Sequence, residues 1–122
     1  MSFQPLRRHC ASLPGATMDV KWGADECWSV GGKMFAVFGL DGRAERSLSF
    51  KCDPERFLEL TDQPGILPAP YLARAHWVQV VDAAALPASR LRALVDRSHA
   101  LVAARLTRRA RDAAFAAPSP PR

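Results

Sequence analysis

The sequence predicts an α+β fold of two layers, in which a curved antiparallel sheet of about five strands carries helices packed on one face. Two observations lead to this prediction. A block of alternating polar and apolar residues runs from 17 to 52, and apolar residues at helical spacing precede and follow it. The chain has 122 residues, which is enough for one compact core and too few for two. We therefore expect a single domain over residues 1–106.

Residues 4–13 are predicted to form a short helix. Proline at position 5 suits a first helical turn, and Pro14-Gly15 ends the segment. The apolar residues recur every three or four positions, which places them on one helix face: Phe3, Leu6, Cys10 and Leu13.

Four strands are expected next, over residues 17–22, 27–30, 33–40 and 47–52. Gly31-Gly32 predicts a tight hairpin, because both glycines adopt positive φ readily. In the first strand Met18, Val20 and Trp22 share one side, and in the last strand Ser47, Ser49 and Lys51 share the side opposite to the apolar residues. We interpret the block as an antiparallel meander with one covered face and one largely wet face.

Asp53-Pro54-Glu55 predicts a helix start, with an N-cap acceptor, a proline at the first position and an acid near the positive helix end. That helix is expected to end near Asp62. Prolines at 64, 68 and 70 predict an irregular segment over 63–70, followed by a turn of helix over 71–75 and a strand over 77–81. A long amphipathic helix is expected over 87–106, and an Arg-rich, Pro-ending, disordered tail over 107–122.

Several of these blocks, in this order, closely resemble the MmcQ/YjbR family over residues 6–106. They are Leu13-Pro14-Gly15-Ala16-Thr17, Val20-Lys21-Trp22-Gly23, Val30-Gly31-Gly32-Lys33-Met34-Phe35, Phe50-Lys51, Pro64-Gly65, Pro68-Ala69-Pro70-Tyr71-Leu72-Ala73-Arg74 and Trp77-Val78. The resemblance implies a small CyaY-like domain and a label of DNA-binding protein that derives from fold comparison. It implies no catalytic residues, and a fold alone does not fix a function. His99 stands where an aromatic residue is associated with the family.

Charge is unevenly distributed along the chain. The net charge is +5, of which +4 lies between residues 105 and 122, so residues 1–104 carry 12 basic and 11 acidic groups. Global charge is therefore weak support for a nucleic-acid-binding domain. The arginines after residue 104 suit phosphate contacts, stabilisation of the helix end or plain solubility.

The three lysines are the most informative basic residues, because they all fall in the strand block while 14 of the 17 basic residues are arginine. We predict a cationic nucleic-acid-binding patch on the open side of the sheet, with the adjacent loop and the proline-rich segment contributing arginines: Lys21, Lys33, Lys51, Arg43, Arg46 and Arg74. The alternative is that these cations are solvated strand ends that discourage aggregation. The three tryptophans suit base stacking, although core packing explains Trp22 and Trp77 better.

Catalytic chemistry is not indicated. The three histidines are scattered, no spacing suggests a metal site, and Gly31-Gly32-Lys33 lacks the pattern of a phosphate loop. Cys10, Cys27 and Cys52 form an odd, widely spaced set, which we interpret as reduced and mostly buried. The chain is therefore expected to be no enzyme and to bind no cofactor and no metal.

The sequence favours a monomeric DNA-associated domain that contacts phosphates. The alternative is a protein-interaction or chaperone-like module that uses the sheet face and the proline-rich loop. No stretch approaches the roughly 20 apolar residues of a membrane span, and the N-terminus lacks the apolar run of a secretory signal, so a cytoplasmic location is expected.

Overall fold

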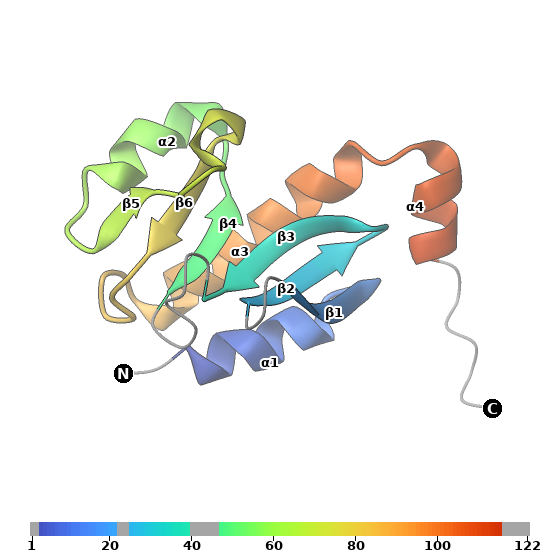
Figure 1. The fold of residues 1–122 in the computed structure, drawn as a ribbon, viewed down its shortest axis with the longest axis horizontal. Helices are drawn as coiled ribbons and strands as arrows, with labels where there is room; N and C mark the ends of the chain where they lie inside the picture. The colour runs from blue at the N-terminus through green and yellow to red at the C-terminus, as the bar shows by residue number, and fades with distance from the viewer. Residues whose placement is uncertain (1–2, 22–24, 40–46, 116–122) are drawn as a thin grey trace.

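The computed structural model describes residues 3–21, 25–39 and 47–115 (Figure 1). Its elements follow one another as α1 (Gln4–Ser12), β1 (Ala16–Lys21), β2 (Asp25–Val30), β3 (Lys33–Phe38), β4 (Leu48–Lys51), α2 (Pro54–Thr61), β5 (Ile66–Pro68), the 3₁₀ turn η2 (Ala73–Ala75), β6 (Trp77–Val80), α3 (Ala88–Ala104) and α4 (Arg108–Ala114). The predicted helices over 4–13, 53–62 and 87–106 correspond to α1, α2 and α3.

The strands form one antiparallel sheet in the order β1-β2-β3-β4-β6-β5, which confirms the α+β prediction. Six strands are present among the described residues, one more than the five expected. The additional strand is β5, within the segment 63–70 that we expected to be irregular. Pro68 has no amide hydrogen, but β5 pairs only with β6 and lies at the edge of the sheet, where a proline is tolerated.

The main core lies between the sheet and the helices α1, α2 and α3. Phe35, Phe38 and Phe50 are at most 1% exposed, and α3 crosses behind β3 and β4 in Figure 1. The helical spacing predicted for α3 is confirmed by its buried residues, which share one helix face because each lies three or four positions from others in the set: Leu91, Leu94, Val95, Ser98, His99 and Val102. Because these apolar groups leave water together, they supply the principal stabilisation of the fold.

The opposite face is less wet than we predicted. Ser47 and Ser49 are fully buried there, and a second apolar cluster forms around Cys27, Val37 and Trp77. The chain between β5 and β6 contributes Ala69 and Leu72 to this cluster, so the proline-rich segment covers part of the face. The pattern of the strands alone does not reveal that covering segment.

Met18 and Val20 pair with Trp28 and Glu26, on the face of the sheet that carries the main core, but they are not buried there. Both are about half exposed, at 48% and 54%, and every residue of β1 is exposed or only partly buried. The reason is topological, since β1 is the other edge strand of the sheet. Trp22, the third residue of the predicted apolar side, lies outside the described residues.

The Gly31-Gly32 hairpin is confirmed, with φ values of 58° and 81°. A β-bulge follows, because Trp28 pairs with Ala36 whereas Ser29 pairs with Met34, which leaves Phe35 as the additional residue. The bulge lies two residues after Lys33, near the start of β3.

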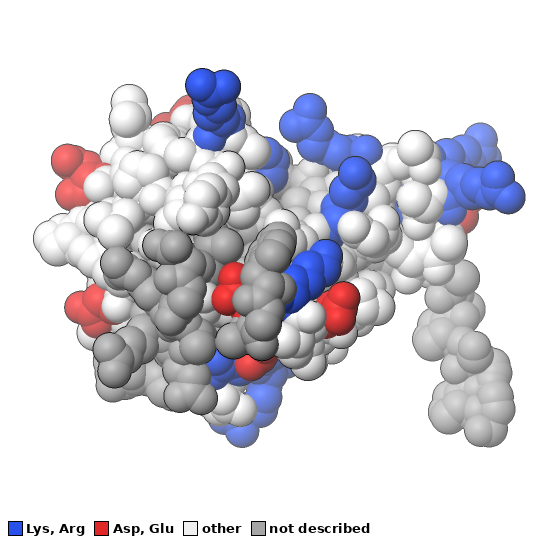
Figure 2. Space-filling model, in the orientation of Figure 1, with Lys and Arg blue, Asp and Glu red and all other residues white. Residues whose placement is uncertain are grey.

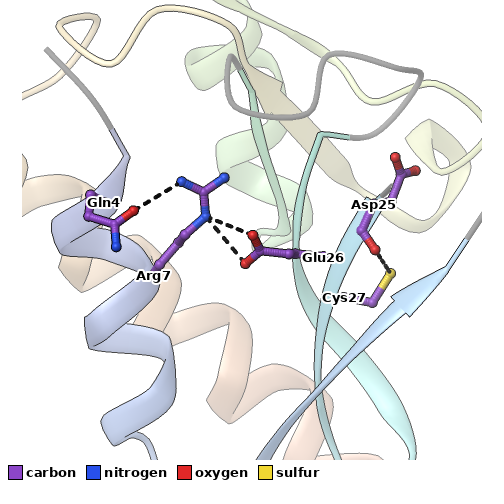
Figure 3. A network of polar contacts seen from close by, with 5 residues as sticks. All are labelled: Gln4, Arg7, Asp25, Glu26 and Cys27. Carbon is purple, nitrogen blue, oxygen red and sulfur yellow. Dashed lines mark hydrogen bonds and ion pairs between the residues drawn. The ribbon is translucent and has the colours of Figure 1, made fainter. Parts of the chain in front are cut away.

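Helix α1 is fixed to β2 by an ion pair at the border of the core (Figure 3). Arg7 Nε lies 3.2 Å from both carboxylate oxygens of Glu26, and Arg7 Nη1 donates to Gln4. The guanidinium also lies over the Phe38 ring, 4.9 Å from its centroid. Arg7 is therefore used inside the fold and is not available as a free surface cation.

The region 107–122, expected to be a disordered tail, contains a helix in its described part. Thr107 caps α4, because its hydroxyl accepts a hydrogen bond from the Ala110 amide at 3.1 Å. Ala110 and Ala114 pack against the main core, and the Phe115 ring meets His99 edge to face. These contacts hold the segment against the domain; residues 116–122 lie outside the described residues.

Candidate nucleic-acid interface

The most distinctive surface feature is an open hollow at the end of the sheet where β3 begins, β4 ends and α3 terminates. Its volume is about 370 Å³. Three cationic side chains and four apolar ones line it: Lys33, Lys51 and Arg105, with Met34, Leu72, Trp77 and Val102. We call this the cationic hollow.

Lys51 is held in this hollow at both its backbone and its side chain. The pairing of β3 with β4 ends at Ala36 and Phe50, and Ser98 Oγ connects the next residues of the two strands. It accepts from the Lys51 amide at 3.0 Å and donates to the Phe35 carbonyl at 2.6 Å. The Lys51 ammonium in turn donates to the Ala75 carbonyl at 2.6 Å. Its other two N–H donors have no partner within residues 3–21, 25–39 and 47–115.

The electrostatics of the hollow are unbalanced. Partial burial lowers the pKa of Lys51, and the nearby positive charge of Arg105 lowers that pKa further. Within the described ranges, neither lysine nor Arg105 forms an ion pair with a carboxylate. An anion placed here would therefore relieve repulsion between like charges.

Other arginines of the domain behave differently. Arg97 donates to both carboxylate oxygens of Asp53, at 2.8 and 2.9 Å, and Arg7 pairs with Glu26 as described above. The side-chain hydrogen bonds from Arg97 lower the pKa of Asp53. Figure 2 shows basic side chains gathered along the upper edge of the molecule, from the region of η2 towards α4.

The structure brings together only part of the predicted patch. Lys33 and Lys51 both line the hollow, and Arg74 is exposed in η2, one residue before the carbonyl that binds Lys51. Arg43 and Arg46 lie outside the described residues. The predicted patch thus has a described centre of two lysines with an arginine beside it.

Lys21 lies at the opposite end of the strands. It pairs with Asp25, whereas Lys33 pairs with Val30, five residues further along β2. At about 3.3 Å per residue this places the two lysine backbones ~17 Å apart along the strand direction. The charges of Lys21, Asp19 and Asp25 all act on the thiol of Cys27, which places two carboxylates in the same surroundings as this lysine.

Arg105 is the site residue that sequence reasoning failed to include. It directly follows α3, inside the helix predicted over 87–106, and it was grouped with the arginines after residue 104, for which phosphate contacts, stabilisation of the helix end and solubility were all left open. The available signal was the helix end itself, because the last turn of a helix that packs along the sheet must reach one end of the strands. A cation there also favours the negative end of the helix dipole.

The charge of Arg105 predicts a measurable effect on its neighbour. Replacing Arg105 with glutamine is expected to raise the pKa of Lys51 towards its ordinary value, because a repelling positive charge is removed. NMR titration of the lysine side-chain signals measures this directly, since the chain has three lysines. An Arg90→Gln variant at the other end of α3 is the control and leaves that pKa unchanged. An unchanged Lys51 pKa in Arg105→Gln would contradict the proposed proximity of the charges.

The cysteines are free and buried, as predicted from the sequence. Burial raises the pKa of Cys10 to about 12 and that of Cys52 to about 11, and burial likewise raises that of Cys27. A thiol with such a raised pKa is a poor nucleophile at neutral pH. Cys52 borders a second open hollow of about 510 Å³ between α2 and α3, where Asp53 and Arg97 already satisfy one another. The described residues contain no group of three potential metal ligands.

The tryptophans in the described part of the chain are better suited to packing in the apolar clusters than to stacking on nucleic-acid bases. Trp77 is 5% exposed in the second apolar cluster, and Trp28 is half-buried against the main core. His99, at the position that departs from the family pattern, is also buried. It binds the Pro14 carbonyl through Nε2 at 2.7 Å and meets Phe35 edge to face.

The fold and this hollow define a class of small α+β domain: an open antiparallel sheet with helices on one face and a cationic recess at the end of its central strands. The YjbR family model matches residues 11–101, which is most of the chain, and the protein belongs to this family. The resemblance found in the sequence is thereby confirmed.

Two solved structures share the fold. A Deinococcus radiodurans protein with a DUF419 domain is 28% identical, with a TM-score of 0.74, over 89% of this chain and 84% of that chain. A Pseudomonas syringae protein is 21% identical, with a TM-score of 0.67, over 84% of this chain and 99% of that one, and its similarity bears on the fold alone. The search of curated proteins finds no match. None of the helices in the described residues has the length and hydropathy needed to cross a membrane.

Proposed function

We propose that this protein is a non-enzymatic DNA-associated domain that binds backbone phosphates in the cationic hollow. The observation that carries the proposal is the convergence of Lys33, Lys51 and Arg105 on one open recess without carboxylate partners among the described residues. Arg74 extends the positive surface beside it. Arg43 and Arg46 stay part of the predicted surface.

Phosphate is the anion that this arrangement suits best. Arginine offers several donors in a fixed plane, whereas each lysine supplies a compact charge, and together they suit neighbouring oxygens of a sugar–phosphate backbone. The hollow is open and partly apolar, so it admits a polymer that passes across it. The hydrogen bond from Lys51 to Ala75 orients one cation before any ligand arrives, which reduces the entropy lost on binding.

Binding across a range of salt concentrations tests the proposal. We compare the parent with a variant carrying Lys33→Gln, Lys51→Gln and Arg105→Gln, using fluorescence anisotropy of a labelled 12-nucleotide DNA strand. Each neutralised phosphate contact adds about 0.7 to the slope of log K against log salt for a single strand. In the triple variant the steepness of that slope is expected to decrease by about 2. Its affinity at low salt is expected to fall at least ~10-fold.

The matched control removes the same charge elsewhere, through Lys21→Gln, Arg90→Gln and Arg92→Gln. Arg90 is 15 residues from Arg105 on the same helical segment, or ~22 Å. The control is expected to keep most of the slope, and circular dichroism checks that both variants fold. Equal losses in the two variants would show that only net charge matters, and a parent without salt dependence would exclude phosphate neutralisation.

A peptide is the competing occupant, because the lining of the hollow also includes the apolar residues Leu72, Trp77 and Val102. A 12-residue polyglutamate is therefore used as a competitor. The proposal predicts that it displaces the DNA strand only at much higher concentration than an unlabelled strand does. Displacement at equal concentration would contradict the assignment to nucleic acid.

A further inference from the structure

The loop that borders the cationic hollow presents one aromatic side chain almost entirely to solvent. Tyr71 is 87% exposed, the most exposed of the large hydrophobic residues that the structure describes. Its backbone has a φ of 66°, in the left-handed region that a bulky side chain adopts only at an energetic cost. Such a conformation persists when the surrounding structure enforces it, and it is found most often at functional sites.

The loop around Tyr71 is held firmly. The Ala69 amide bonds the Trp77 carbonyl at 3.0 Å, and the Trp77 amide bonds the Leu72 carbonyl at 3.3 Å, which closes the loop at its base. Further bonds within it join Ala75 to Leu72 and His76 to Ala73, each at 3.0 Å. The ring therefore stands on a supported backbone, so stacking on it would order little of the loop.

Tyr71 directly precedes a residue that lines the cationic hollow. The next residue, Leu72, lines the hollow, and consecutive Cα atoms are about 3.8 Å apart. The loop then supplies the carbonyl of Ala75 that binds the Lys51 ammonium. The segment from Tyr71 to Ala75 thus carries the exposed ring at its start, and the Ala75 carbonyl at its end positions the Lys51 ammonium.

We infer that Tyr71 is a base-stacking platform and that the preferred ligand is single-stranded DNA. This inference rests on the proposed function and specifies its substrate. An aromatic ring beside a cationic groove binds the face of an unpaired base while the cations hold the backbone. In a duplex the base faces are already stacked on one another, so the Tyr71 ring gains no such contact there.

The test separates bases from phosphates. A 12-nucleotide thymidine strand is compared with a strand of equal length that has abasic sites at every position but keeps its phosphates, and with a 12-base-pair duplex. Tyr71→Ala is expected to weaken binding of the thymidine strand about 5- to 100-fold, the range that one base–aromatic stack contributes. Binding of the abasic strand and the duplex is expected to change less than 2-fold, with an unchanged salt slope.

Two further variants serve as controls. Tyr71→Phe keeps the ring and is expected to bind like the parent, and Leu58→Ala removes a side chain that is 77% exposed on α2 without affecting binding. Equal weakening of the thymidine and abasic strands by Tyr71→Ala, or no weakening of either, would overturn the inference. The phosphate proposal survives that result if Lys33, Lys51 and Arg105 still determine the salt slope, and it fails separately if they do not.

Discussion

Replacing Phe50 with alanine is expected to lower the free energy of unfolding by about 3–5 kcal/mol. Phe50 is fully buried in β4, where its neighbours across the sheet are Ala36 on β3 and Val78 on β6. Removing the ring takes away apolar burial and leaves a cavity that the surrounding strands fill only in part. A small domain has about 5–15 kcal/mol of total stability, so this loss is a large share of it.

Urea denaturation measures the loss in free energy of unfolding. In thermal denaturation the same loss is expected to lower Tm by ~10–20 °C for a domain of this size. Leu58→Ala is the control, because Leu58 is 77% exposed and its removal is expected to cost less than about 0.5 kcal/mol. Comparable losses in the two variants would contradict the placement of Phe50 at the centre of the core.

Ser98→Ala is expected to cost about 2–4 kcal/mol, although it removes a single oxygen atom. The hydroxyl is fully buried and makes two hydrogen bonds, accepting from the Lys51 amide and donating to the Phe35 carbonyl. Alanine leaves a buried donor and a buried acceptor without their partner at the point where β3 and β4 cease to pair. The end of β4 is then held less firmly, and Lys51 is less well positioned in the hollow.

Ser49→Ala is a matched control for this change. Ser49 is equally buried, but its hydroxyl has no hydrogen-bond partner among the described residues. Its removal is therefore expected to be neutral or stabilising. Hydrogen exchange adds a local measurement, because the Lys51 amide is expected to exchange faster in Ser98→Ala and at the parent rate in Ser49→Ala. Equal stability of the two variants would contradict the bridging role of Ser98.

The proposed function requires rigid, well-packed residues and positive charges without ion pairs to lie next to one another. Phe50 and Ser98 hold the end of the sheet rigid, whereas Lys51 and Arg105 beside them repel one another and form no ion pair with a carboxylate among the described residues. A protein selected for stability alone would gain from a carboxylate in the hollow. The excess of positive charge in the hollow is consistent with a surface that binds an anionic partner.

Periodicity was sufficient for most of the architecture. The helical spacing of α3, the glycine hairpin and the Asp53-Pro54 helix start each depend on interactions within a few residues, and each was predicted from the sequence. Their success has a simple cause, because local sterics act before any tertiary contact forms. The predicted capping by Asp53 is wrong, since its carboxylate makes no capping hydrogen bond and binds Arg97 of α3 instead. The family resemblance was confirmed for a similar reason, since it rests on several blocks in a fixed order.

The failures concern residues whose surroundings come from distant parts of the chain. The exposure of Met18 depends on β1 lying at the sheet edge, and the burial of Ser49 depends on what covers the second face. Pro68 belongs to a strand because β5 pairs only with β6 and lies at the edge of the sheet. The segment after Leu106 forms α4, which Thr107 caps and which packs on the core. None of these conditions is visible in the alternation of a single segment.

The sequence by itself determined the α+β class, the family, the three main helices, the hairpin and the reduced state of the cysteines. Only the tertiary structure decided which cations meet. Strand register separated Lys21 from Lys33, the path of α3 brought Arg105 to Lys51, and the loop before β6 exposed Tyr71 next to Leu72, which lines the hollow. The physical reason is that charge–charge distances depend on how elements pack, whereas the elements themselves depend mainly on neighbours along the chain.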